Sequence, residues 1–328
     1  MKTFPVIDLH EDISAYILES RHEKIVKPFN IDSQRHVDIP KYSKGNVVLV
    51  VGAAFPGEYK YIGGENVRGT IFRCAPQRVM DHIAVYYRLV KEFPESLYLI
   101  EHRDELLKLE RNNGTGIIIG LEGAYPLDDP WDIELYYKLG VRLLGLTWNV
   151  ENRYAASCLS KRDYGLTGSG EELVDLAERY GIVIDLAHAS RRTMLDVLSI
   201  ANKPVVISHA CVRKLRDHPR NVDDEVLEEL KKNHGVIGVT FVADFLGKES
   251  VNVDTVVDHI MYLYENFGID IIAIGTDYLG TTRLPEGLED MSKIQTLFKK
   301  LIEKGLSIED VEKIAWKNAY RVLLEVLR

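Results

Sequence analysis

Residues that can bind a metal or move a proton stand at the ends of short apolar runs along this sequence. These runs are VIDLHED, GIIIGLEG, GIVIDLAH, PVVISH and IIAIGTD, and the residues are His10, Asp12, Glu122, His188, His209 and Asp277. Imidazole and carboxylate groups together suit a zinc-type site, where a bound water becomes a nucleophile near neutral pH. The sequence therefore predicts a metal-dependent hydrolase.

His10 and Asp12 are two residues apart at the end of the first apolar run. Side chains two apart on a strand point to the same side, so both are expected to face one metal ion. An HxD pair on its own has a simpler explanation. Asp12 would then cap the following helix, and His10 would be an ordinary hydrogen-bonded histidine.

Glu122 ends a run otherwise made of Ile, Gly and Leu, where an unpaired buried carboxylate would be costly. A metal is a natural partner for it, and one carboxylate can bridge two ions through its two oxygens. His10, Asp12 and Glu122 are then predicted to hold one ion, and Glu122, His188 and His209 the other. The alternative is a salt bridge between Glu122 and Arg142.

Asp277, in GTDYLG, ends the last apolar run. A carboxylate there is well placed to take a proton from the attacking water and pass it to the leaving group. Asp277 and the bridging Glu122 are therefore the predicted catalytic residues. For Asp277 the competing interpretation is a cap of the following turn.

These residues need a scaffold that gathers strand ends at one place. Near-continuous Val, Ile and Leu predicts strands buried on both faces, at 4–9, 47–55, 116–122, 141–147, 181–187, 204–209, 235–242 and 271–276. Helical spacing predicts helices between them, at 77–93, 132–140, 170–181, 223–235, 253–268 and 291–305. The alternation favours a (β/α)8 TIM barrel, in which catalytic groups lie at the C-terminal ends of the strands.

One domain over residues 1–328 is expected, since barrels of this type often exceed ~250 residues. Residues 308–327 are predicted to form one or two peripheral helices on the barrel exterior. Residues 55–76, which are rich in Gly and Pro, are predicted to form a long loop after the second strand.

Charge and composition argue against several other classes of protein. The chain carries 41 basic and 50 acidic residues, well mixed, which predicts neither a nucleic-acid nor a membrane partner. Its three cysteines, widely separated, indicate no disulfide framework. No run approaches the ~18 apolar residues of a membrane span, and the first strand starts almost at once, so we expect a cytoplasmic protein.

The ordered motifs resemble those of the membrane (renal) dipeptidase family, which are zinc enzymes of the amidohydrolase-type barrel superfamily. The matching blocks are IDLHED, GLEGAYPL, GVRLLGLTWN, GIVIDLAHAS, PVVISHACVRKLRDHPRN, NHGVIGVTF, AIGTDYLG and WKNAYRVL. The resemblance implies a centre of two Zn²⁺ ions with the ligand sets given above, Asp277 as the proton-handling residue, and a homodimer. It also implies that Arg220 binds the terminal carboxylate of a dipeptide substrate. Mn²⁺, Fe²⁺ or Co²⁺ would suit the same ligands.

Three positions depart from the family pattern, all in the substrate-contacting blocks. Trp148 stands where well-studied members have a histidine that polarises the scissile carbonyl, and we expect it to wall the pocket as a substrate-binding residue. Val242 replaces a tyrosine, and Leu279 replaces an aspartate. The metal set is thus intact while the substrate set is altered.

The leading hypothesis is a zinc-dependent dipeptidase that cleaves the amide bond with a water held between two ions. Trp148 and Val242 motivate an alternative, in which a related barrel acts on a cyclic amide, a lactone or an N-acyl amino acid. A metal-stabilised binding protein without turnover is the third hypothesis. The complete ligand set argues against it.

Overall fold

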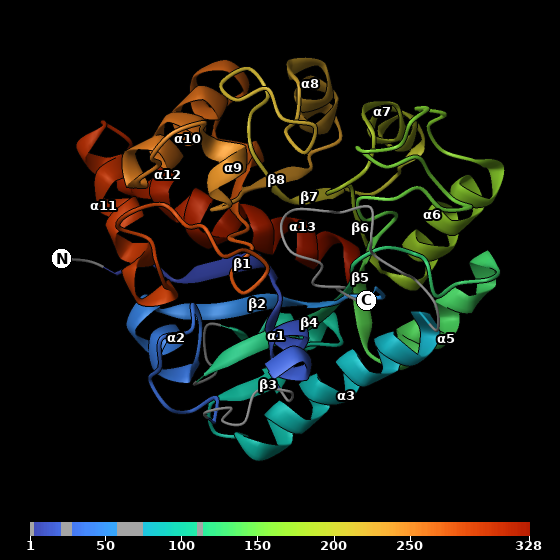
Figure 1. Cartoon of the computed structure of the whole chain (residues 1–328), viewed down its shortest axis with the longest axis horizontal. Helices are drawn as coiled ribbons and strands as arrows, with labels where there is room; N and C mark the ends of the chain where they lie inside the picture. The colour runs from blue at the N-terminus through green and yellow to red at the C-terminus, as the bar shows by residue number, and fades with distance from the viewer. Residues whose placement is uncertain (1–2, 21–27, 58–74, 110–113) are drawn as a thin grey trace.

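The computed structural model describes residues 3–20, 28–57, 75–109 and 114–328 (Figure 1). Its strands all pair in parallel, in the order β2-β1-β9-β8-β7-β6-β5-β4-β3, and an additional β2–β4 pairing closes the sheet. The strands are β1 (Val6–Glu11), β2 (Val47–Ala54), β3 (Leu97–Leu99), β4 (Thr115–Leu121), β5 (Val141–Gly145), β6 (Val183–Asp185), β7 (Val206–Ala210), β8 (Val236–Val239) and β9 (Ile272–Ile274). The predicted (β/α)8 barrel is confirmed.

Eight of these strands match the predicted ones, with shorter bounds in most cases. β3 was not predicted, because three residues are too short for a pattern to be seen. It pairs with the first residues of β4, while the later residues of β4 pair with β5. β3 is therefore an addition to the closed barrel and supplies none of the predicted site residues.

Helices surround the strands (Figure 1). They are α1 (Ile13–Ser20), α2 (Ile39–Gly45), α3 (Ala75–Glu92), α4 (Arg103–Leu106), α5 (Ile133–Lys138), α6 (Gly168–Tyr180), α7 (Arg191–Ile200), α8 (Asp224–Lys232), α9 (Ala243–Leu246), α10 (Val253–Phe267), α11 (Ile294–Glu303), α12 (Ile308–Glu312) and α13 (Asn318–Val326). All six predicted helices are present; α1, α2, α4, α7 and α9 are additional. Local signals set the ends of α6, since Thr167 accepts a hydrogen bond from Gly170 N–H and Gly181 ends the helix at φ 78°.

The C-terminal segment is helical and lies on the barrel exterior, as predicted. α12 and α13 are joined by a π-helical turn, Lys313–Lys317. The Asn318 side chain donates to the carbonyls of Ile269 and Ile272, and Arg321 donates to the carbonyls of His234 and Asp270. Those carbonyls precede or begin β8 and β9. The segment covers the N-terminal end of the barrel, on the side away from the predicted site.

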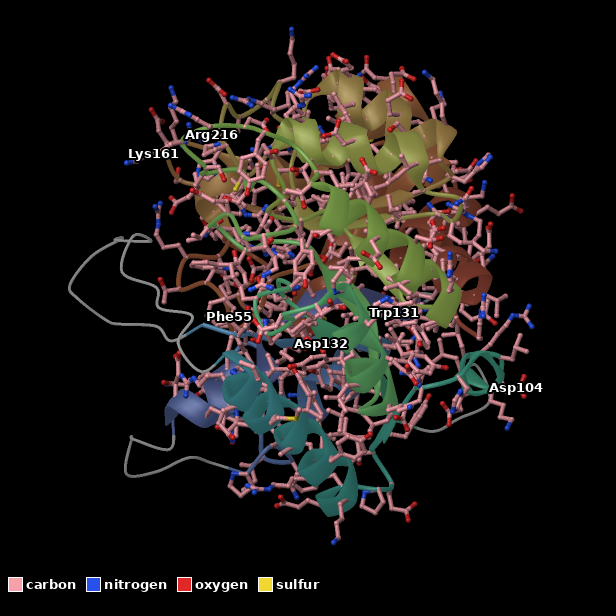
Figure 2. The ribbon with its side chains drawn as sticks, turned by 90° about the vertical axis from the view of Figure 1, so that its right-hand side faces the viewer. Phe55, Asp104, Trp131, Asp132, Lys161 and Arg216 are labelled. Atoms are coloured by element: carbon pink, nitrogen blue, oxygen red, sulfur yellow. The ribbon has the colours of Figure 1, made fainter. Side chains whose placement is uncertain are left out.

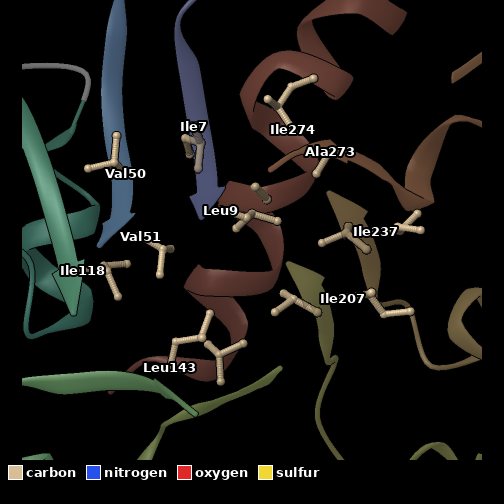
Figure 3. Packing of buried hydrophobic residues seen from close by; sticks show 14 of the residues in the cluster. Ile7, Leu9, Val50, Val51, Ile118, Leu143, Ile207, Ile237, Ala273 and Ile274 are labelled. Carbon is tan, nitrogen blue, oxygen red and sulfur yellow. The ribbon is translucent and has the colours of Figure 1, made fainter. Parts of the chain in front are cut away.

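The strands are apolar because both of their faces are covered. All the residues of β1, β4, β5 and β7 are buried. Figure 3 shows residues of neighbouring strands within one continuous apolar cluster, among them Val50, Val51, Ile118, Leu143, Ile207 and Ile237. This packing fixes the strands, and so fixes where each strand ends.

Two further expectations concern the loop after the second strand and a membrane-spanning helix. Most of the predicted loop at 55–76 falls on residues 58–74, which lie outside the described residues. Among the residues that the structure describes, no helix has the length and apolar character needed to cross a bilayer.

Candidate metal centre

The six predicted residues lie at the C-terminal ends of five barrel strands. His10 is in β1 and Asp12 follows it, Glu122 follows β4, His188 follows β6, His209 is in β7, and Asp277 follows β9. Figure 2 shows this end of the barrel from the side: Phe55, just after β2, is on the same side of the molecule as Lys161 and Arg216, and Asp104 is on the opposite side. All six are therefore presented at one mouth.

The side-chain atoms of these residues converge. His10 Nε2 lies 3.6 Å from Asp12 Oδ2 and 3.7 Å from Glu122 Oε1. Glu122 Oε1 lies 3.1 Å from His188 Nε2 and 3.9 Å from His209 Nε2. Glu122 Oε1 thus lies within 3.9 Å of the Nε2 atoms of His10, His188 and His209.

Two overlapping groups place ligand atoms within 4.8 Å of one another. One is His10, Glu122 and His209, and the other is His10, Asp12 and Asp277. His10 is common to both groups. Asp277 is itself a member of the second group, so its carboxylate lies beside the predicted ligands. The two groups therefore form one continuous cluster of possible metal ligands.

Backbone strain helps to aim two of the side chains. His188 has φ 65° and Asp277 has φ 63°, a left-handed conformation that few residues other than glycine adopt. Such strain persists only where the surrounding structure holds it, and it concentrates at functional sites. Gly280 is required by close approach, because a Cβ there would lie 2.1 Å from Asp12 Oδ2 and 2.3 Å from Asp277 Oδ1.

The electrostatics of the cluster favour a bound cation. Burial raises the pKa of Glu122 well above its usual range and that of Asp277 to about 7. Burial also lowers the pKa of both His188 and His209, and nearby positive charges add to that effect. For His10, burial is outweighed by Glu122 and Asp12, and its pKa is raised to about 10. His188 and His209 are therefore neutral imidazoles that can act as ligands. The raised pKa values of the carboxyl groups show that the protein alone does not place enough positive charge beside them, and a bound cation would supply it.

Several buried polar atoms of the cluster have no hydrogen-bond partner within the described part of the chain. These atoms are His10 Nε2, Asp12 Oδ1 and Glu122 Oε2. A buried polar atom without a partner costs about 1–3 kcal/mol, so three of them in one cluster need a common explanation. A divalent metal would satisfy all three, and their nitrogen and oxygen chemistry suits zinc. The residues present therefore fit a metal centre.

The competing interpretation of Glu122 fails. Arg142 is near the start of β5, where its guanidinium donates to the carbonyls of Glu101, Tyr137 and Val141. It lies at the opposite end of the barrel from Glu122 and forms no salt bridge with it.

Arg220 lies in the loop after β7 and is 3 % exposed. Its Nη2 donates to the His209 carbonyl over 3.2 Å, and its guanidinium lies 5.3 Å from the centre of the Phe245 ring. Arg220 Nε and Nη1 have no partner among the described residues. A buried guanidinium with two free donors beside His209 is suited to an anionic group of a ligand.

Trp148 follows β5 at the same mouth. Its ring centroid lies 5.1 Å from that of Phe55 and 5.8 Å from that of His188. It therefore contacts the cluster with an apolar ring. Val242 is buried just before α9, and Leu279 adopts φ 71° two residues after Asp277.

Sequence reasoning missed the residues that hold the imidazoles. Asn149 Oδ1 lies 2.8 Å from His188 Nδ1, and Ser208 Oγ lies 2.8 Å from His209 Nδ1. Each is adjacent to a residue already singled out, Asn149 to Trp148 and Ser208 to His209. That adjacency was the only available signal, because partners across strands are set by the fold.

A parallel barrel with histidines and carboxylates converging at its C-terminal mouth defines the class of metal-dependent hydrolase barrels. A family model described as membrane dipeptidase, peptidase family M19, matches residues 1–328. The chain therefore belongs to the membrane dipeptidase family. It is a metal-dependent dipeptidase.

Individual relatives agree with this assignment. An uncharacterized dipeptidase of Schizosaccharomyces pombe is 32% identical over 335 residues, covering 97% of this chain and 79% of the relative. Dipeptidase tcpJ of Claviceps purpurea is 30% identical over 302 residues, covering 90% of this chain and 70% of the relative. A metallopeptidase of Rhodobacter sphaeroides, solved with a phosphinate mimic of L-Ala-D-Ala, shares the fold. Its TM-score is 0.89 at 20% identity, with 99% of this chain and 100% of that chain covered.

Proposed function

We propose that the chain hydrolyses small dipeptides at a centre of two divalent ions, with Zn²⁺ as the native metal. His10 and Asp12 would hold one ion, His188 and His209 the other, and Glu122 would bridge them. The three unpartnered polar atoms inside this ring are the observation that carries the proposal. We also propose that residues 1–328 form one domain, since a single apolar cluster runs from Phe4 to Leu327.

The bound metal would supply Lewis-acid activation of a water and of the scissile carbonyl. The protein's own residues do the rest. Asp277, within reach of the same cluster, takes a proton from the attacking water and delivers it to the leaving amine nitrogen. Trp148 and Phe55, whose rings contact each other, would wall one side of the mouth.

The proposal is tested by metal analysis of the purified protein together with a substrate panel. Near two divalent ions per chain is expected, with turnover of free dipeptides lost on chelation and restored by Zn²⁺. The panel includes cyclic amides, a lactone and N-acyl amino acids. If zinc-loaded protein turns over one of these and no dipeptide, the proposed substrate class is wrong.

Arg220 is proposed to bind the terminal carboxylate of the dipeptide through its two free donors. Arg220→Lys keeps the charge but loses the paired donors. KM is expected to rise about 10- to 100-fold with kcat little changed, the worth of a charge-assisted hydrogen bond at about 1.5–3 kcal/mol.

The control is a substrate change rather than a second variant. The wild type should discriminate against a dipeptide whose terminal carboxylate is converted to an amide. The Arg220→Lys enzyme should lose most of that discrimination. Equal discrimination by both enzymes would mean that Arg220 does not bind this carboxylate.

A further inference from the structure

We propose that Asp185 and Ser208 act as positioning residues, which fix the tautomer of His209 so that its Nε2 is free to bind metal. This inference rests on the proposed function, because it takes His209 as a ligand. Neither Asp185 nor Ser208 belongs to the predicted ligand set. Both are buried, with Asp185 at the end of β6 and Ser208 in β7.

Hydrogen bonds hold both carboxylate oxygens of Asp185. Its Oδ1 accepts backbone N–H groups from Ala187 over 2.9 Å and from Ser208 over 2.8 Å. Its Oδ2 accepts the Ser208 hydroxyl over 2.5 Å. Both oxygens of the carboxylate thus have donors, and the carboxylate ties the ends of two neighbouring strands together.

Ser208 in turn contacts the imidazole of His209. A serine hydroxyl has one proton, and Ser208 donates it to Asp185. Ser208 Oγ can therefore only accept from His209 Nδ1, which lies 2.8 Å away. Nδ1 carries the proton, and Nε2 presents its lone pair towards Glu122 and His188. Such a hydrogen bond fixes ring orientation as well as tautomer.

His188 has the same arrangement with a different partner. Asn149 Oδ1 lies 2.8 Å from its Nδ1, and the Cys158 thiol donates to the same oxygen over 3.6 Å. The two Nε2 atoms lie 2.9 Å apart. If both rings carry their proton on Nδ1, two lone pairs face each other, and only a shared positive charge makes this arrangement favourable.

A second carboxylate and hydroxyl join two strand ends in the same way, but this hydroxyl accepts from a backbone N–H instead of an imidazole. Asp8 Oδ1 accepts from His10 N–H and Thr276 N–H, and Asp8 Oδ2 accepts the Thr276 hydroxyl over 2.6 Å. Thr276 Oγ1 then accepts from the Tyr278 backbone N–H. Tying strand ends together therefore needs only the carboxylate and the hydroxyl. The contact from Ser208 to the imidazole is an additional feature, specific to His209.

Two substitutions test this hydrogen-bond relay, which runs from Asp185 through Ser208 to His209, in different ways. Ser208→Ala removes the acceptor. Asp185→Asn is nearly isosteric, but its amide would donate to Ser208, whose hydroxyl proton would then turn to His209 Nδ1 and favour the tautomer that cannot bind metal. We expect one of the two ions to bind about 10- to 100-fold more weakly in each variant, measured by competition with a chelator. Ser208→Thr, which keeps the hydroxyl, should restore binding.

Thr115→Val is the matched control, because it deletes a buried hydroxyl that donates to the Val47 carbonyl at the other end of the barrel. It should lower thermal stability much as Ser208→Ala does and leave metal affinity unchanged. Equal loss of metal affinity in both variants, or none in Ser208→Ala and Asp185→Asn, would overturn the relay.

A second measurement does not depend on metal. In the chelated full-length protein with ¹⁵N-labelled histidine, the His209 ring should show a protonated Nδ1 and an unprotonated Nε2. Asp185→Asn should shift the ring towards a protonated Nε2. A wild-type ring protonated at Nε2 would overturn the relay even if the enzyme is a zinc dipeptidase. Wild-type protein that binds no ion would instead overturn the proposed function, whatever the tautomer.

Discussion

Glu122→Gln should reduce kcat/KM for a dipeptide by about 10³-fold, corresponding to several kcal/mol of transition-state stabilisation supplied through the metals. The substitution keeps the shape of the side chain but removes the charge that faces His10 and His188 over 3.7 and 3.1 Å. Bound metal should fall from near two ions per chain to one or fewer. Metal analysis and steady-state kinetics on the same preparation measure both effects.

The stability of this variant gives the control. Burial raises the pKa of Glu122, so its carboxylate is unfavourable when no cation is present. In the presence of a chelator, Glu122→Gln should therefore be at least as stable as the wild type, and Zn²⁺ should raise its Tm less. A variant that is much less stable than chelated wild type would indicate a structural role for Glu122 instead.

Asp277→Asn should lower kcat by about 10²–10⁴-fold, the usual worth of a positioned general base. The amide is the same size as the carboxylate but cannot take the proton of the attacking water. KM and metal content should stay close to those of the wild type. This pattern differs from Glu122→Gln, in which activity and metal are lost together.

The test is informative because Asp277 lies in one of the two groups of ligand atoms, with His10 and Asp12. If Asp277→Asn loses an ion, then Asp277 is a ligand and another group must manage the proton.

Gly280 offers a further check of crowding beside Asp277. Gly280→Ala would push a methyl group against both Asp12 and Asp277 and is expected to disturb metal binding and proton transfer together.

The barrel and the convergence of the six residues could be predicted because both depend on local pattern. A strand such as GIIIGL has apolar side chains on both faces because both faces are buried. This burial is typical of a parallel sheet covered by helices. Once the strands are parallel, their C-terminal ends meet at one edge. His10, Glu122 and His209 are therefore brought together by strand position alone.

Arg220 illustrates what the pattern could not reach. It stands ten residues beyond the end of β7, in a loop without periodicity, and only the family resemblance marked it. The fold returns that loop to the mouth through backbone pairing of Val212 with Val222. Asn221 then pins it, by accepting from Cys211 N–H and donating to the carbonyls of Arg216 and Phe245.

The sequence by itself determined the strands, most of the covering helices and the residue types at the strand ends, because these follow from burial and periodicity. Only the tertiary structure decided the partners across strands. It placed Arg142 at the far end from Glu122, laid α13 across the base of the barrel, and joined Asp185 to Ser208 and His209. The physical reason is that a hydrogen bond acts over about 3 Å, so its partners depend on three-dimensional position, which spacing along the chain does not specify.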